Sequence, residues 1–411
     1  MMRFNRLLPA ALFSALVGLV GCSFAADDAY SAGPAQTALG EVAASRATVR
    51  VHYPVGARAL SLTAEHGPVS AQNVGDDTWE FTFDDVASTL SVKPVLDSVP
   101  ARGPNYTARA GQTVDIYPHF FDQKGSVSTR WRNFKSNVHP QPFGRGRPIE
   151  VYLPPSYKEN TTARFPVIYM MDSQIVFGNS ILGTALMGDM KVDEQLDAAA
   201  EAGTIAEAIV VGILSPVSLN LSDPMEARNL ELTPTKAADP TGSVKKSGDG
   251  PKFLSMLVDE LKPLVDSELR TKPGRETTFI GGASLGGLMS VYAGVTRGDI
   301  FGGIVAMSSS AFWDNRIAAR MIREAKTGPK QTLRAYADIG GGEVYPDTEI
   351  KDMMIVTNKD LFQAYADAGY VEGTNLMTQV TPVIEPGKEH NGKYWAMRVP
   401  TAFAFVVGAG R

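Results

Sequence analysis

The fold is decided by residues 277–296, which read TTFIGGASLGGLMSVYAGVT. An apolar run leads into GASLG (282–286), and an apolar periodic segment follows, so the stretch predicts a strand, a sharp turn and a helix. A serine on such a turn needs small neighbours, and glycines surround Ser284 on both sides. The pattern indicates a nucleophile elbow, in which the backbone N–H of Leu285 faces a developing oxyanion. A glycine-rich phosphate loop is the alternative, but the chain has no G-x-x-x-x-G-K-[ST] motif.

Strand and helix signals alternate on both sides of this stretch. Apolar runs of strand length lie at 149–153, 165–171, 208–214, 277–280, 302–307, 333–339 and 377–384. Helical periodicity covers 193–202, 252–270, 285–296, 350–369 and 393–409. Pro263 lies inside the second of these helices and predicts a kink there. The alternation predicts an α/β domain over 130–411, with a parallel sheet that carries helices on both faces.

Residues 46–125 have a different pattern. Apolar and polar residues alternate in short runs, as in 79–83 (WEFTF), and Gly/Asp/Asn/Pro clusters separate the runs. Several short strands at regular spacing predict a small all-β sandwich domain. Residues 23–45 are rich in Ala, Ser, Gly and Asp without periodicity and predict a flexible tether.

The first 22 residues have the pattern of an export signal. Arg3 and Arg6 precede an apolar run, 7–20, which is too short for a membrane-spanning helix. The run ends in LVGC (19–22), which resembles the lipobox of bacterial lipoproteins, and Cys22 would then be lipidated. Cleavage after Ala25 with plain secretion is the alternative. Either way, we expect an exported protein, periplasmic or anchored to a membrane through lipid only.

Composition excludes several classes of protein. The chain has 411 residues with 39 basic and 44 acidic side chains, a net charge of -5, and no Lys/Arg cluster. Nothing therefore indicates a nucleic-acid partner. A single cysteine excludes a disulfide framework and a cysteine-rich metal site. No metal or organic cofactor is implied.

A serine nucleophile needs a base and an acid, and in this topology the chain order is Ser, acid, His. Of five histidines only His390 follows Ser284, so His390 is the predicted base. The acid must follow the strand at 333–339. The candidates are Asp338, Glu343, Asp347 and Glu349. The turn GGG (340–342) gives Glu343 room to bend toward the histidine, so Glu343 is preferred; Asp347 and Asp338 stay open.

With these residues in place, the chain resembles the Putative esterase family of α/β-hydrolases. That family includes enterochelin-type siderophore esterases, feruloyl and acetyl-xylan esterases, S-formylglutathione hydrolase and mycolyltransferases. The resemblance rests on IEVYLPP (149–155), VIYMMDSQ (167–174), RNLELTP (228–234), the elbow, SSSAFW (308–313) and the His390 loop.

The resemblance also implies roles for single residues. In the family, the loop after an Asp-Gly-Gln stretch supplies the second backbone N–H of the oxyanion hole. The resemblance implies this role for Gln174 in the present chain. Ser173 stands where the family commonly has Gly. The family's acid often follows a Gly-rich turn, which favours Glu343. Residues 46–125 more weakly resemble the immunoglobulin-like (E-set) domain that precedes the hydrolase domain in some members.

Together these predict an α/β-hydrolase preceded by a β-sandwich, acting as an exported serine carboxylesterase. Its implied substrate is a small-molecule or carbohydrate-linked ester, either a siderophore ester or a feruloyl or acetyl ester. An acyltransferase with the same triad and a non-catalytic binding protein on this fold stay open as alternatives. The oligomeric state is not predicted.

Overall fold

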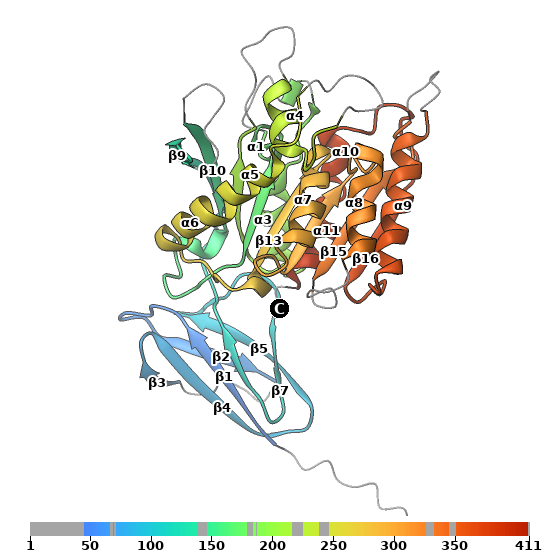
Figure 1. Ribbon diagram of the computed structural model, residues 1–411. Helices are drawn as coiled ribbons and strands as arrows, with labels where there is room; N and C mark the ends of the chain where they lie inside the picture. Colours follow the sequence, from blue (N-terminus) through green and yellow to red (C-terminus); the bar gives the residue numbers. More distant parts are fainter. Residues whose placement is uncertain are drawn as a thin grey trace, which may run out of the picture. The chain divides into compact units, whose positions relative to one another are not determined.

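The computed structural model describes residues 45–65, 69, 71–137, 146–178, 184, 185, 187–215, 225–237, 246–325, 333–344 and 351–409 (Figure 1). The predicted leader with Cys22 lies outside the described residues, as do Asp347 and Glu349, two of the candidate acids. Within the described part of the chain, no helix combines the length and apolarity needed to cross a membrane.

An eight-stranded sheet positions the candidate site. Its strand order is β16-β15-β14-β13-β11-β12-β10-β9. The strands are β9 (Ser126–Phe134), β10 (Arg147–Leu153), β11 (Val167–Met171), β12 (Ile209–Ile213), β13 (Thr278–Ala283), β14 (Gly303–Met307), β15 (Arg334–Gly340) and β16 (Leu376–Thr381). β10 is antiparallel to both β9 and β12, and the other pairings are parallel. The carboxyl ends of the parallel strands therefore meet at one edge of the sheet.

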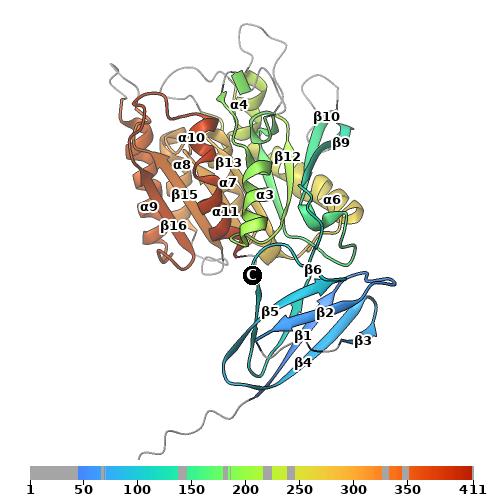
Figure 2. The same ribbon diagram turned by 180° about the vertical axis from the view of Figure 1, so that it is seen from behind.

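Helices cover both faces of this sheet. The helices are α1 (Ser173–Val176), α3 (Val192–Ala202), α4 (Glu226–Leu232), α5 (Gly250–Ser255), α6 (Lys262–Glu268), α7 (Leu285–Thr296), α8 (Trp313–Glu324), α9 (Met353–Asp367), α10 (Gly392–Ala396) and α11 (Val399–Val407). Helices α5 to α9 lie on the face turned forward in Figure 1, and α3 and α11 lie on the face turned forward in Figure 2.

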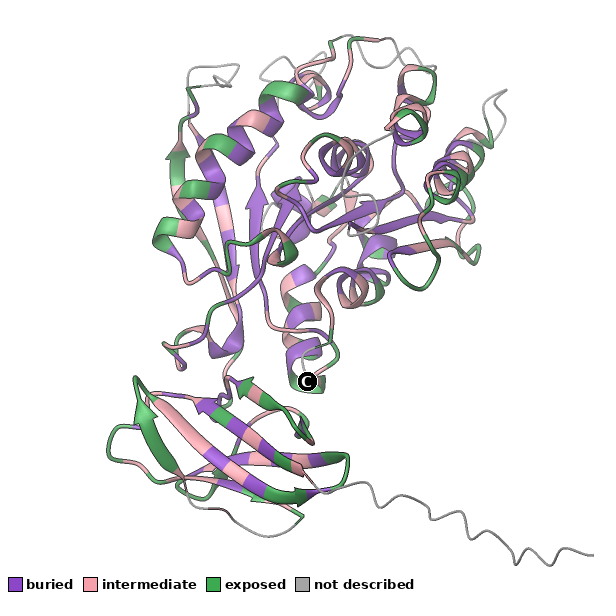
Figure 3. Cartoon of the chain, turned by 60° about the horizontal axis from the view of Figure 1, so that its bottom comes forward, coloured by how far each residue is buried: buried purple, intermediate pink, exposed green. Residues whose placement is uncertain are grey.

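The strand period of two explains the two covered faces. Alternate residues of β11 enter different clusters: Tyr169 packs with α7 and α8 residues, whereas Ile168 packs with Phe403 of α11. All five residues of β11, β12 and β14 are buried, and Figure 3 shows these central strands buried along their length. A strand that is buried on both faces of a sheet needs apolar side chains at nearly every position. The continuous apolar runs of the sequence have this composition. The predicted α/β-hydrolase sheet is confirmed.

Three predicted boundaries differ from the structure. The helix predicted over 252–270 with a kink at Pro263 is interrupted just before that proline by a π-helical segment, η2 (Met256–Leu261), because a proline cannot donate the N–H that a regular α-helix needs there. The helix predicted at 393–409 is two helices, and Pro400 lies at the start of the second. The predicted hydrolase start at 130 falls inside β9, so the sheet begins at Ser126.

The residues before β9 form two smaller sheets. One has the order β3-β4-β1-β8, and the other has β2-β5-β6 with β7 paired to β5. The strands are β1 (Ser45–His52), β2 (Leu60–Ala64), β3 (Gln72–Gly75), β4 (Thr78–Val86), β5 (Thr89–Leu96), β6 (Val99–Pro100), β7 (Tyr106–Arg109) and β8 (Thr113–Ile116). Inward residues such as Val49, Phe81 and Val92 share one buried cluster. The alternation in the sequence thus corresponds to a packed all-β region.

Candidate active site

Ser284 lies on a strained turn between β13 and α7. Its φ of 96° and ψ of -102° are unusual for a residue with a side chain. Two backbone hydrogen bonds hold the turn: the Ser284 N–H donates to the Met307 carbonyl at 3.2 Å, and the Ser310 N–H donates to the Ser284 carbonyl at 2.9 Å. A side chain at Gly282 would place its Cβ 2.9 Å from the Gly286 Cα, so the turn requires glycine there.

The structure brings Ser284, His390 and Glu343 together. His390 Nε2 lies 2.9 Å from Ser284 Oγ, and His390 Nδ1 lies 2.7 Å from Glu343 Oε2. A carboxylate can only accept, so the Nδ1 atom carries the proton and Nε2 is free to accept from the serine hydroxyl. The imidazole also packs edge-on against Trp395 at 5.1 Å between ring centroids. Ser284 directly follows β13, and Glu343 and His390 lie in the segments that follow β15 and β16, so the carboxyl edge of the sheet brings them together.

Glu343 is 3% exposed and its carboxylate is fully engaged. Oε1 accepts from the Ser308 hydroxyl at 2.5 Å and from the Gly340 N–H at 2.9 Å, while Oε2 faces His390. Burial by itself raises the pKa of Glu343, but the hydrogen bonds from His390 and Ser308 and the charge of Arg398 outweigh it. The pKa of Glu343 therefore lies below its ordinary value, and the group is ionised at neutral pH.

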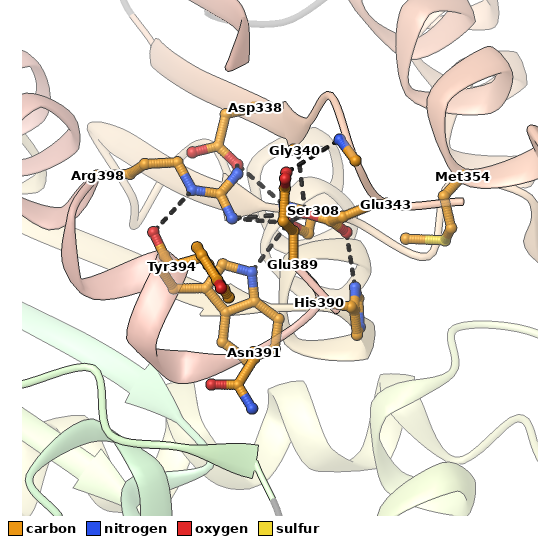
Figure 4. A network of polar contacts seen from close by, with 12 residues as sticks. Ser308, Asp338, Gly340, Glu343, Met354, Glu389, His390, Asn391, Tyr394 and Arg398 are labelled. Atoms are coloured by element: carbon orange, nitrogen blue, oxygen red, sulfur yellow. Dashed lines mark hydrogen bonds and ion pairs between the residues drawn. The ribbon is translucent and has the colours of Figure 1, made fainter. Parts of the chain in front are cut away.

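Asp338 faces away from the histidine. Its Oδ1 accepts from Arg398 Nη1 at 2.8 Å and from the Ser308 N–H at 3.1 Å, and its Oδ2 accepts from the Tyr336 hydroxyl at 2.7 Å. Burial raises the pKa of Asp338 despite the adjacent guanidinium. Asp338 thus pairs with a buried cation, and within the described part of the chain it forms no hydrogen bond or ion pair with the imidazole (Figure 4).

Arg398 was not singled out by the sequence analysis. It is 5% exposed and lies between the two carboxylates, with Nη2 3.1 Å from Ser308 Oγ and 3.5 Å from Glu343 Oε1. One feature of the sequence could have indicated a buried ion pair. Arg398 directly precedes the apolar run of α11, where a charged side chain must find a partner. Its partner could not be read from the sequence, because Asp338 is 60 residues away.

A second buried ion pair holds the loop after β11. Asp172 has left-handed backbone angles, φ 63° and ψ 50°, and precedes α1. Arg228 donates to both of its oxygens at 2.7 and 2.8 Å, and the Ser215 hydroxyl donates at 2.6 Å. Burial raises the pKa of Asp172, but the Arg228 charge and these hydrogen bonds bring it below the ordinary value. The loop is therefore held rigidly next to the elbow.

Gln174 and Leu285 lie in the first turns of α1 and α7, respectively. The Gln174 side chain bonds locally: Nε2 donates to Asp172 at 3.2 Å, and Oε1 accepts from the Ser215 N–H at 3.3 Å. Backbone N–H groups of a first helical turn have no intrahelical acceptor. The two helix starts are neighbours, since a Cβ added at Gly286 would lie 3.4 Å from the Met171 Cβ. The arrangement is compatible with two N–H groups facing one oxyanion, and this role stays a prediction.

Ser173 fits this loop because position 212 is glycine. The Ser173 side chain is fully buried, and a Cβ added at Gly212 would lie 2.7 Å from the Ser173 Cβ. The extra atoms of the serine therefore occupy space that a side chain on β12 would otherwise fill.

Among the described residues, no group of three His, Cys, Asp or Glu side chains could hold a metal ion.

The parallel sheet, the elbow and the hydrogen-bonded Ser–His–Glu arrangement define an α/β-hydrolase. The model of the family described as "Putative esterase" matches residues 141–405. The chain belongs to this family of ester-hydrolysing enzymes, as its sequence motifs predicted.

Comparison with individual proteins agrees with this membership. The chain is 27% identical over 266 residues to the uncharacterized protein YbbA of Bacillus subtilis, covering 64% of this chain and 94% of that protein. It is 29% identical over 211 residues to the siderophore triacetylfusarinine C esterase of Aspergillus fumigatus. This match covers 49% of this chain and 66% of that esterase. Among solved structures, it is similar to an IroE-like serine hydrolase from Shewanella oneidensis. That match has 19% identity and a TM-score of 0.51, covers 68% and 80% of the two chains, and concerns the fold alone.

Proposed function

We propose that this protein hydrolyses carboxylic esters through an acyl-enzyme formed on Ser284. The observation that carries the proposal is the continuous hydrogen-bond chain from Ser284 Oγ through His390 to Glu343, at 2.9 and 2.7 Å. Nucleophile, base and orienting acid stand in the order that acyl transfer requires.

In this mechanism Ser284 Oγ attacks the ester carbonyl carbon while His390 Nε2 takes its proton. The negative charge that develops on the carbonyl oxygen is stabilised by the N–H groups of Leu285 and Gln174. Glu343 keeps the proton on Nδ1 and stabilises the imidazolium. His390 then gives its proton to the leaving alcohol as the C–O bond breaks, and water releases the acid by the reverse sequence. No step requires a cofactor.

For the natural substrate, we propose a siderophore ester. Two relatives support this choice: the esterase named above, and the ferri-bacillibactin esterase BesA of Bacillus subtilis, which is 28% identical over 159 residues and of which the chain covers 50%. A panel of ferric and iron-free siderophore esters, with feruloyl and acetyl esters of sugars beside them, tests the assignment. A clear preference for the sugar esters would replace it.

Ser284→Ala tests the mechanism. We expect ester hydrolysis to fall by about 10³–10⁶-fold with the fold intact, because only the acyl-enzyme route is lost. The same change should abolish labelling by a fluorophosphonate probe. Ser309→Ala is the control, since Ser309 is a fully buried serine beside the site and its hydroxyl bonds no described side chain or backbone group. Near-normal turnover in Ser284→Ala would exclude the mechanism.

We further propose that the protein is exported and anchored through lipid on Cys22. The support is the sequence at 1–22 alone, which lies outside the described residues. Cys22→Ser should move the protein from the membrane fraction to the soluble periplasmic fraction, because the acyl chains of a lipoprotein together hold it stably at the bilayer. Identical soluble behaviour of both forms would indicate cleavage after Ala25 instead.

A further inference from the structure

We propose that Ser308 is a positioning residue for the acid of the triad, and that Trp395 and Arg398 fix the direction of its hydroxyl proton. The inference rests on the proposed function, because it concerns how Glu343 is presented to His390. Figure 4 shows the polar network around Ser308, Asp338, Glu343 and Arg398.

Ser308 is held in one place by its backbone. It follows the last residue of β14, is fully buried, and has a φ of 44°, in the left-handed region. Its N–H donates to the Asp338 carbonyl at 3.0 Å and to Asp338 Oδ1 at 3.1 Å. A non-glycine residue keeps such angles only where its surroundings enforce them. The backbone therefore fixes the position of the Ser308 Cβ, to which the hydroxyl is attached.

The direction of the Ser308 proton follows from valence. A hydroxyl donates once and accepts twice. Both acceptor positions are taken, by Trp395 Nε1 at 2.9 Å and by Arg398 Nη2 at 3.1 Å. An indole N–H and a guanidinium can only donate. The one remaining partner that the described residues offer is Glu343 Oε1 at 2.5 Å, so the proton must point at the carboxylate.

This hydrogen bond helps to fix the orientation in which the Glu343 carboxylate faces the histidine. Glu343 Oε1 receives the Ser308 proton and the Gly340 N–H, which leaves Oε2 for His390 Nδ1 at 2.7 Å. Rotating the carboxylate away from the imidazole would break these two hydrogen bonds to a side chain that is 1% exposed. Ser308 thus acts on the imidazole through the acid, without touching substrate.

The neighbouring serines provide an internal comparison. The run SSS (308–310) places one hydroxyl at each end of the triad: Ser308 meets the acid, and Ser310 Oγ lies 3.4 Å from Ser284 Oγ. Ser309 between them is equally buried, and its hydroxyl has no hydrogen-bond partner among the described residues. Ser309→Ala therefore removes a buried hydroxyl next to the site without touching the network.

The experiment compares Ser308→Ala and Ser309→Ala in the full chain, with p-nitrophenyl acetate as substrate. Alanine keeps the Cβ and loses only the hydroxyl. Since a hydrogen bond to a charged group is lost, we expect Ser308→Ala to lower kcat about 10- to 100-fold with KM unchanged. Ser309→Ala should stay within about twofold of the parent. Thermal unfolding confirms that each variant is folded.

A double-mutant cycle separates positioning from general structural support. If Ser308 acts through Glu343, Ser308→Ala should have little further effect on kcat in a Glu343→Ala background. An equal loss in both backgrounds, or an unchanged kcat in Ser308→Ala, would overturn the inference. Should Ser308→Ala not fold, Ser308→Cys keeps the shape with a weaker donor, and a loss of kcat that depends on Glu343 is again expected. If Ser284→Ala stays active, the proposed function fails; if it is inactive while Ser308→Ala is normal, only this inference fails.

Discussion

Glu343 and Asp338 lie in one polar network, yet their partners give them different tasks. Glu343 turns one oxygen to His390, whereas Asp338 bonds Arg398, Tyr336 and a backbone N–H. The pKa of Glu343 lies below its ordinary value and that of Asp338 above it, since burial is outweighed only at Glu343. A substitution of Glu343 should therefore lower the activity, whereas a substitution of Asp338 should lower the stability of the fold.

Glu343→Gln should lower kcat by about 10⁴-fold with little change in stability, because an amide favours the wrong imidazole tautomer. Asp338→Asn should instead destabilise the fold by about 3–5 kcal/mol, because it removes the nearer of the two carboxylates that face the buried Arg398 charge. Steady-state kinetics and urea unfolding of both variants test this contrast. A larger kcat loss in Asp338→Asn, at unchanged stability, would assign the acid role to Asp338.

At the scale of elements, the candidate site depends on two helix starts held side by side. Helix α7 begins at the elbow, and α1 begins after the loop that the Asp172–Arg228 pair holds. The contact between Ser173 and Gly212 joins α1 to β12. A small shift of α1 would move the Gln174 N–H without disturbing the triad.

Gly212→Ala should displace α1. The added methyl would meet the Ser173 Cβ at 2.7 Å and the Phe177 ring at 2.8 Å. Overpacking of this kind costs about 1–3 kcal/mol, and we expect kcat to fall more than tenfold as the proposed oxyanion donor, the Gln174 N–H, moves. Ser173→Gly in the same chain should recover part of both losses. A Gly212→Ala variant with lower stability but normal kcat would show that Gln174 does not serve the oxyanion.

At the scale of the whole molecule, the chain has separate buried cores. One is formed by residues between Ala47 and Phe120 of the β-sandwich, and the other two flank the eight-stranded sheet. The residues of the triad and their hydrogen-bond partners all follow Ser126, where that sheet begins. We propose that the first domain influences access of large substrates and contributes no chemistry.

A chain that begins at Lys124 tests this proposal, because it keeps β9 whole and retains the Gly125 N–H bond to Asp197 at 2.8 Å. We expect it to hydrolyse p-nitrophenyl acetate at a rate near that of the full chain. Turnover of a bulky siderophore ester should fall further, because remote contacts supply binding energy that a small ester does not use. A folded but inactive truncated chain would show that the first domain completes the site.

Much of this protein is determined by local sequence. Buried strands, an elbow with its glycines and the order of Ser284 and His390 are encoded in short patterns, because period and turn chemistry act over a few residues. The sequence narrowed the acid to four carboxylates and preferred Glu343, since a flexible turn precedes it. Only the tertiary structure decided that Glu343 faces His390 while Asp338 pairs with Arg398. The Ser308 network joins residues up to 90 positions apart, and such contacts depend on which strands become neighbours and which side chains are buried together.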